Sequence, residues 1–100
     1  MTTNEVYKIV KDNPKYEVSN HGNVRTFNNY FDKYYDLSPI RMKSGGYKVN
    51  LGDNSRYRFT PYYVNRLVAS HFMDDFDSKK PVYHLDKDSS NNHIDNLYQA

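Results

Sequence analysis

The sequence predicts an α+β fold, with a small antiparallel sheet followed by one main helix. Two observations lead to this prediction. Short stretches that alternate apolar and polar residues, separated by turn residues, recur over the first 59 positions, and a helical apolar face follows them. The chain has 100 residues, the size of one small domain. It contains no cysteine, so neither a disulfide nor a thiolate zinc site can stabilise it.

The alternating stretches define the expected strands of this sheet. We expect strands over residues 7–11, 15–18, 23–27, 47–51 and 56–59. Short polar residues, proline and glycine at 12–14, 19–22 and 52–55 predict the turns between them. Residues 28–39 break the alternation and predict a loop with exposed aromatic side chains.

Thr60 and Pro61 predict the start of the helix, because threonine can cap a helix N-terminus and proline suits the first helical position. We expect the helix over residues 61–72, with one apolar face formed by Val64, Leu67, Val68, His71 and Phe72. Leu67, Val68 and Phe72 should pack against Ile9, Val18, Val24, Val49 and Leu51. The one histidine on this face, His71, is interpreted as a packed side chain with satisfied hydrogen bonds.

Residues 82–85 form a short extended run that delivers His84 into a polar loop. The loop is crowded with short polar side chains: Asp86, Asp88, Asn91, Asn92, His93, Asp95 and Asn96. Such a density is typical of a metal or phosphate site, and also of a turn whose side chains satisfy backbone groups. Candidate ligands for a divalent metal, Mg²⁺ or Zn²⁺, are His84, Asp86 and His93, but no spacing here is diagnostic.

The charge is distributed unevenly along the chain. The net charge of +2 is too small to indicate nucleic-acid binding, but the middle of the sequence is basic. The candidate phosphate contacts are Arg25, Arg41, Lys43, Lys48, Arg56 and Arg58. The alternative is that these side chains form a solvated face of the sheet. Four aromatic residues of the expected loop, Tyr30, Phe31, Tyr34 and Tyr35, favour a partner surface.

Five stretches occur in an order typical of one family: residues 16–25, 45–51, 65–72, 82–86 and 91–97. Together they resemble phage-type HNH homing endonucleases that carry an N-terminal nuclease-associated modular domain. The resemblance implies one domain over residues 1–100. Residues 1–59 would form the sheet module, and residues 60–100 a partial ββα-metal (HNH-like) motif.

The resemblance also implies roles for individual residues. His84 matches the general base that activates water against a DNA phosphate, and Asn96 matches a residue that helps to orient it. Three positions depart from the family pattern. Tyr83 stands where a residue helps to hold the metal, Asn65 stands where a histidine is usual, and the chain ends at Ala100, before the helix that carries a further metal ligand. The expected function is therefore that of an HNH-endonuclease-like DNA-binding protein whose catalytic activity is weak or lost.

Two other functions remain open. One is a small phage-encoded inhibitor of a bacterial defence nuclease, similar to anti-CRISPR proteins, in which the acidic run 74–77 imitates a phosphate backbone. The other is an active metal-dependent DNA nickase that completes its metal site in another way. The expected partner is DNA, or alternatively a bacterial defence nuclease.

No apolar run approaches the roughly 18 to 20 residues that span a bilayer, and no signal peptide opens the sequence. We therefore expect a cytoplasmic protein without a membrane partner, located in the host cytoplasm if it is encoded by a phage.

Overall fold

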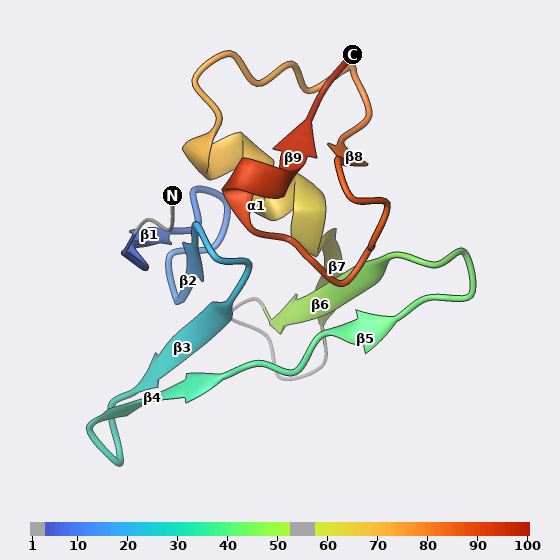
Figure 1. Ribbon diagram of the computed structural model, residues 1–100. Coiled ribbons are helices and arrows are strands. Elements are labelled where there is room, and N and C mark those ends of the chain that lie inside the picture. Colours follow the sequence, from blue (N-terminus) through green and yellow to red (C-terminus); the bar gives the residue numbers. More distant parts are fainter. Residues whose placement is uncertain (1–3, 53–57) are drawn as a thin grey trace.

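The computed structural model describes residues 4–52 and 58–100 and confirms the α+β fold (Figure 1). The elements in chain order are β1 (Tyr7–Ile9), β2 (Tyr16–Ser19), β3 (Val24–Asn28), β4 (Lys33–Asp36), β5 (Ile40–Arg41), β6 (Tyr47–Gly52), β7 (Phe59–Tyr63), the helix α1 (Val64–Phe72), β8 (Tyr83–His84), the 3₁₀ turn η1 (Ile94–Asn96) and β9 (Leu97–Tyr98). Arg56, a candidate phosphate contact, lies outside the described residues.

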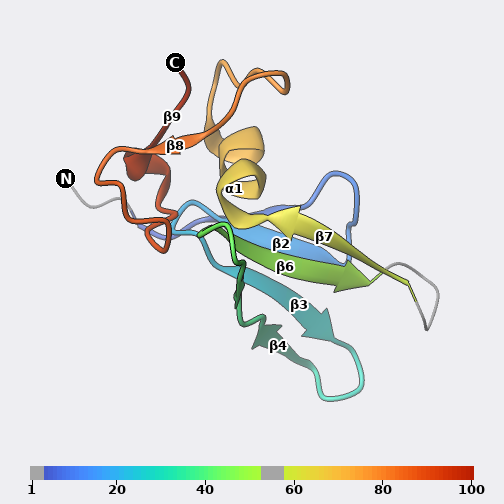
Figure 2. The ribbon, with the colours of Figure 1, turned by 90° about the vertical axis from the view of Figure 1, so that its right-hand side faces the viewer.

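The strands form separate antiparallel sheets rather than the single expected sheet. Within the described residues, the orders are β1-β2-β3-β4, β5-β6-β7 and β8-β9. The first sheet ends where the Leu37 N–H donates to the Val24 carbonyl, 2.9 Å away. Pro39 follows, and a proline cannot donate to a strand ladder. Figure 2 shows α1 on one side of β2, β6 and β7, with the β3–β4 hairpin reaching away from the helix.

The helix and the inner faces of the two larger sheets form the core. Its buried apolar residues are Val10, Val18, Val24, Val49, Leu51, Val64, Leu67, Val68, Ala69, Val82 and Leu97. The predicted burial of Leu67 and Val68 against the valines and Leu51 is thus confirmed, while Phe72 is half-buried at the rim. The prediction for Ile9 was wrong, because Ile9 pairs with Glu17 on the outer face and is 59% exposed. The next residue, Val10, enters the core instead.

The helix begins at Val64, three residues later than predicted. Thr60 and Pro61 belong to β7, where they pair with Leu51 and Asn50 of β6. β7 is the last strand of its sheet in the described part of the chain, and proline is tolerated on such an edge because a neighbour does not need its N–H. Pairing with β6 therefore overrides the local capping signal. The predicted end of the helix at Phe72 is confirmed.

Residues 28–39 also differ from the prediction, because β3 and β4 form a hairpin there. Phe27 pairs with Tyr34 across the hairpin, and their rings meet edge to face at 5.0 Å. The Asn28 side-chain oxygen accepts the N–H groups of Tyr30 and Phe31 and so shapes the turn. Cross-strand aromatic pairs of this kind stabilise a hairpin whose side chains are exposed to solvent. Tyr30, at the tip, is 88% exposed.

Among the described residues, no helix is long and apolar enough to cross a membrane.

Candidate functional site

The short ladder between β8 and β9 places His84. Tyr83 pairs with Tyr98, and His84 pairs with Leu97. Adjacent residues of a strand point to opposite faces, so Tyr83 and His84 face opposite ways. The Tyr83 ring lies against the Tyr98 ring, with centroids 5.4 Å apart, and both tyrosines are exposed. His84 is half-buried on the other face.

A buried asparagine orients the His84 ring. Nε2 of His84 lies 2.7 Å from the Asn92 side-chain oxygen. The Asn92 amide nitrogen donates to the Ser89 carbonyl at 3.3 Å, which assigns the oxygen to the side facing His84. An amide oxygen only accepts, so Nε2 carries the proton in the neutral imidazole. Nδ1, which has no hydrogen-bond partner among the described residues, is then left as the basic nitrogen.

Asn96, expected to orient His84, holds the loop together instead. Its amide nitrogen donates to Asp86 Oδ1 at 2.9 Å and to the Asn91 carbonyl at 2.8 Å. Its side-chain oxygen accepts the Asp86 N–H at 3.1 Å. The structure therefore gives the contact with His84 to Asn92 and gives Asn96 a role in closing the turn.

The two carboxylates at the start of the loop act as turn acceptors. Hydrogen bonds from the Asn91 side chain, the Asp88 backbone and the Asn96 side chain lower the pKa of Asp86. Bonds from the Ser90 hydroxyl and N–H lower the pKa of Asp88 in the same way. The hydrogen bonds that these two carboxylates accept within the loop therefore stabilise their charged forms.

His84 and Asn92 line a cleft of about 330 Å³ between the segment 81–92 and the β5–β6 hairpin. Met42 and Ser44 of that hairpin line its other wall. Arg41 and Lys43 alternate with them in sequence and are exposed. The fold thus brings two of the candidate phosphate contacts to the hairpin that borders the candidate base.

The other basic candidates have different surroundings. The Arg25 guanidinium lies between the Tyr7 ring at 3.6 Å and the Tyr34 ring at 3.7 Å, and its Nε donates to Glu17 at 2.8 Å. These contacts give Arg25 a packing role in the first sheet. Lys48 is half-buried on β6, opposite Ile40 and Tyr63, and Arg58 is exposed next to β7.

The three candidate metal ligands, His84, Asp86 and His93, each contact different partners. His84 bonds to Asn92, and Asp86 accepts from Asn91 and Asn96. The His93 ring stacks on the His21 ring at 4.5 Å, and its Nδ1 accepts the Asp95 N–H. Residues 4–52 and 58–100 contain no group of three or more His, Asp or Glu residues that could hold a metal ion.

A solved structure that describes DNA binding and cleavage by the HNH homing endonuclease I-HmuI is similar to this chain. The TM-score is 0.79 and the identity is 28%; the match covers 95% of this chain and 52% of that one. This chain has an HNH-type nuclease fold. It spans about half the length of the nuclease that it matches. No protein-family model matches the sequence, and no curated protein matches it.

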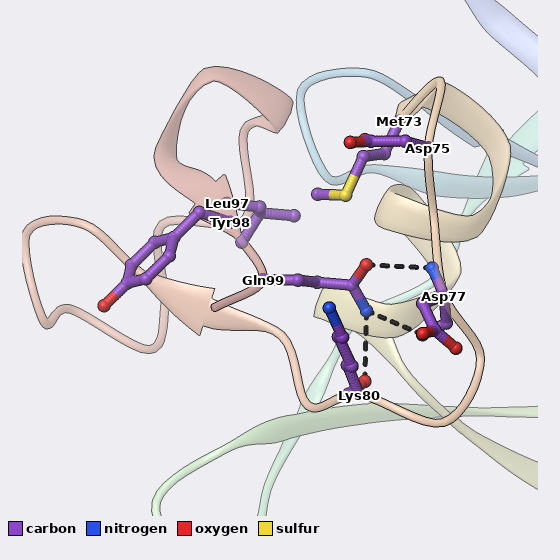
Figure 3. A pocket seen from close by; sticks show the side chains of 7 residues that line it. All are labelled: Met73, Asp75, Asp77, Lys80, Leu97, Tyr98 and Gln99. Carbon is purple, nitrogen blue, oxygen red and sulfur yellow. Dashed lines mark hydrogen bonds between the residues drawn. The ribbon is translucent and has the colours of Figure 1, made fainter.

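The HNH-type fold here includes a loop before β8 that is clamped from two sides. Arg66 of α1 donates to the carbonyls of Lys80 and Ser78, at 2.8 Å each. Gln99 donates to the carbonyls of Asp77 and Lys80 and accepts the Asp77 N–H at 2.9 Å. Figure 3 shows Gln99 in this position, beside a pocket of about 300 Å³ lined also by Met73 and Leu97. Asp77, the last residue of the acidic run 74–77, is thus held by Gln99.

Sequence reasoning missed several residues that shape the candidate site. Asn91, Asn92 and Asn96 are chemically alike, so nothing in the pattern could tell which amide meets His84. The clamps made by Arg66 and Gln99 join segments far apart in the sequence and leave no local signal. The interpretation of His71 as a satisfied side chain is confirmed, because its Nδ1 lies 2.9 Å from the Leu67 carbonyl and its Nε2 accepts the Lys11 N–H at 3.1 Å.

Proposed function

We propose that this chain binds DNA through an HNH-type nuclease scaffold on which metal-dependent cleavage is weak or lost. The observation that carries the proposal is Tyr83, the residue immediately before His84. Its side chain is a neutral phenol, and its ring packs on Tyr98 on the strand face opposite to His84. A phenol is a poor ligand for a hard divalent cation, which prefers carboxylate and carbonyl oxygens.

The described residues do not fit a divalent-metal site of this kind. Asp86 is the carboxylate nearest to His84 in sequence, and its oxygens already accept from Asn91, Asn96 and the Asp88 backbone. The Asn92 side-chain oxygen, which could otherwise be a metal ligand, is hydrogen-bonded to Nε2 of His84. The chain's own chemistry is therefore an oriented imidazole with an open Nδ1, which can accept a proton or a hydrogen bond from a ligand in the cleft.

The support for DNA as the ligand is the position of positive charge. Arg41 and Lys43 are exposed on the hairpin that borders the His84 cleft, and Lys48 lies on the following strand. Lysine and arginine side chains bind DNA phosphates with little dependence on the DNA sequence, and each contact releases counterions. The similar I-HmuI structure concerns DNA binding and cleavage by that enzyme.

A binding experiment with a charge-matched control tests this surface. The double variant Arg41→Ala/Lys43→Ala and the control Lys11→Ala/Lys79→Ala each remove two exposed positive charges, but only the first pair lies on the β5–β6 hairpin, whose residues Met42 and Ser44 line the cleft. We expect the first pair to weaken binding to a short duplex and to flatten the salt slope by about two units, and the control to change neither by more than a small amount. Equal effects of the two pairs, or no binding by the wild type at low salt, would refute the proposed surface.

A plasmid-nicking assay in Mg²⁺ and Mn²⁺ tests the second half of the proposal. We expect negligible nicking by the purified chain. Robust nicking that disappears in His84→Ala would restore the enzyme hypothesis. Nicking that survives in His84→Ala would identify a contaminant and leave the proposal standing.

A second candidate function, the inhibitor of a bacterial defence nuclease, is favoured by the β3–β4 hairpin. Five of its aromatic side chains are substantially exposed: Phe27, Tyr30, Phe31, Tyr34 and Tyr35. Residues 27–36 carry two carboxylates against one lysine, a net charge of −1, which suits a protein partner better than a polyanion. Absent DNA binding at low salt would favour this function over the first, because an inhibitor of this type needs no phosphate contacts that release counterions.

A further inference from the structure

We propose that Gly22 is a positioning residue for His84: the turn between β2 and β3 fixes Asn92, and Asn92 in turn holds the imidazole. This inference rests on the proposed function only in treating His84 as the group that meets the ligand. It deepens that function by assigning part of the site to the N-terminal sheet, 62 positions before His84 in the chain.

The turn and the loop approach each other so closely that only glycine fits. Gly22 has a φ of +92°, a conformation that side chains of L-residues rarely adopt. A Cβ added there would lie 2.9 Å from the Cβ of Asn92 and 3.1 Å from its backbone C and O atoms. Those atoms belong to a buried residue and to the main chain, so they cannot swing away as the end of a flexible side chain would.

The two residues before Gly22 make contacts that hold the same approach. The Asn20 carbonyl accepts the Ile94 N–H at 2.8 Å, and the His21 ring stacks on the His93 ring at 4.5 Å. Asn20 is itself fixed, because its side-chain oxygen accepts the Val6 N–H at 2.8 Å. The turn between β2 and β3 is therefore tied to the N-terminal segment, and it meets three consecutive residues of the loop, 92–94.

The contact is transmitted to His84 by a single side chain. Asn92 is 7% exposed, and its oxygen lies 2.7 Å from Nε2 of His84. A displaced Asn92 would lose this short bond and with it the preference for a proton on Nε2. The ring would then populate both neutral tautomers, and Nδ1 would not be reserved for a ligand.

The experiment compares two glycines with similar positive φ angles. Gly45 has a φ of +99°, and a Cβ added there meets nothing within 4 Å. Gly22→Ala and Gly45→Ala therefore carry similar backbone strain, but only the first pushes on Asn92. The readout is the tautomer of His84 by ¹⁵N NMR of histidine-labelled protein, with the signal assigned from a His84→Ala sample.

We expect the wild type and Gly45→Ala to show one tautomer, protonated at Nε2. Gly22→Ala and Asn92→Ala should both show a mixture, and Gly22→Ala/Asn92→Ala should show no more change than Asn92→Ala alone. A merely structural role for Gly22 would not move this signal while the protein stays folded. A folded Gly22→Ala protein with the wild-type tautomer would overturn the proposal.

If Gly22→Ala does not fold, His21→Ala decides the question, because it removes the stacked ring without straining the backbone. A mixed His84 tautomer in His21→Ala then supports the proposal, and an unchanged tautomer refutes it. Duplex binding measured on the same samples separates this inference from the proposed function. Absent binding by the wild type refutes DNA as the ligand, whereas the tautomer result is independent of it.

Discussion

His71 in the helix α1 and His84, which immediately precedes the loop 85–96, are both half-buried, and the two histidines are held in opposite ways. His71 in α1 uses both ring nitrogens, one toward the Leu67 carbonyl and one toward the Lys11 N–H. His84, at the start of the loop, has one nitrogen bonded to Asn92 and the other without a partner among the described residues. A satisfied imidazole fills a structural role, whereas an oriented imidazole with one open nitrogen beside a cleft can do chemistry.

The two regions also owe their stability to different forces. The inner face of α1 buries Val64, Leu67, Val68 and Ala69, so the hydrophobic effect stabilises it. The loop buries two polar residues, Asn92 and Asn96, and satisfies them with side-chain and backbone hydrogen bonds. Each such bond contributes about 1 kcal/mol net, but an unsatisfied buried amide costs more than that. The hydrogen bonds can therefore fix the conformation of the loop while contributing little to the free energy of unfolding.

The largest expected effect comes from one residue type placed in both regions. Leu67 of α1 is 5% exposed, and Leu85 of the loop is 61% exposed. Leu67→Ala should lower the free energy of unfolding by about 2 to 5 kcal/mol, because it leaves a cavity in the core. Leu85→Ala should change it by less than about 0.5 kcal/mol. Chemical denaturation of both variants checks this difference, and similar losses would mean that the two regions do not differ in how they are stabilised.

A smaller effect should follow from breaking the polar network of the loop. Asn96→Ala removes the bonds to Asp86 and to the Asn91 carbonyl and should cost about 1 to 3 kcal/mol. The control is Asn91→Ala, whose exposed side chain makes one bond, to Asp86 Oδ2. It should cost less than about 1 kcal/mol. If Asn91→Ala destabilises the protein as much as Asn96→Ala, the burial of Asn96 is not what closes the loop.

How far the sequence could predict this molecule follows the same division. Burial has a period, so alternation in residues 16–18 and 47–51 predicted the inward positions of Val18, Val49 and Leu51. The same pattern was ambiguous at the chain start, where Ile9 and Val10 are adjacent and either one could face inward. It was the pairing of Ile9 with Glu17 that decided between them.

The site was less predictable, because its geometry depends on contacts between distant segments. The turn 19–22 could be predicted from its residues, but its contact with Asn92 could not, since 70 positions separate Gly22 from Asn92. The helix start was misplaced for a related reason: Thr60 and Pro61 carry a capping signal, but pairing with β6 draws them into a strand. The resemblance to HNH endonucleases predicted the fold, and it assigned the orienting amide to Asn96, where the structure has Asn92.

The smallest expected effect is a difference in acid sensitivity between the two regions. Hydrogen bonds from Asn91, the Asp88 backbone and Asn96 lower the pKa of Asp86 in the folded protein. A carboxyl whose folded pKa lies below its unfolded value of about 3.9 stabilises the fold above that value and loses its contribution as the pH falls through the folded pKa. The apolar contacts of α1 do not titrate.

Amide hydrogen exchange should therefore show the loop amides of Asp88 and Asn96 losing protection below pH 4, before the amides of α1 do so. Asp86→Asn should remove much of that acid step, with the remainder due to Asp88, whose pKa is lowered in the same way. Loss of protection in the loop and in the helix at one and the same pH would show that acid acts on the whole fold rather than on the carboxylates of the loop.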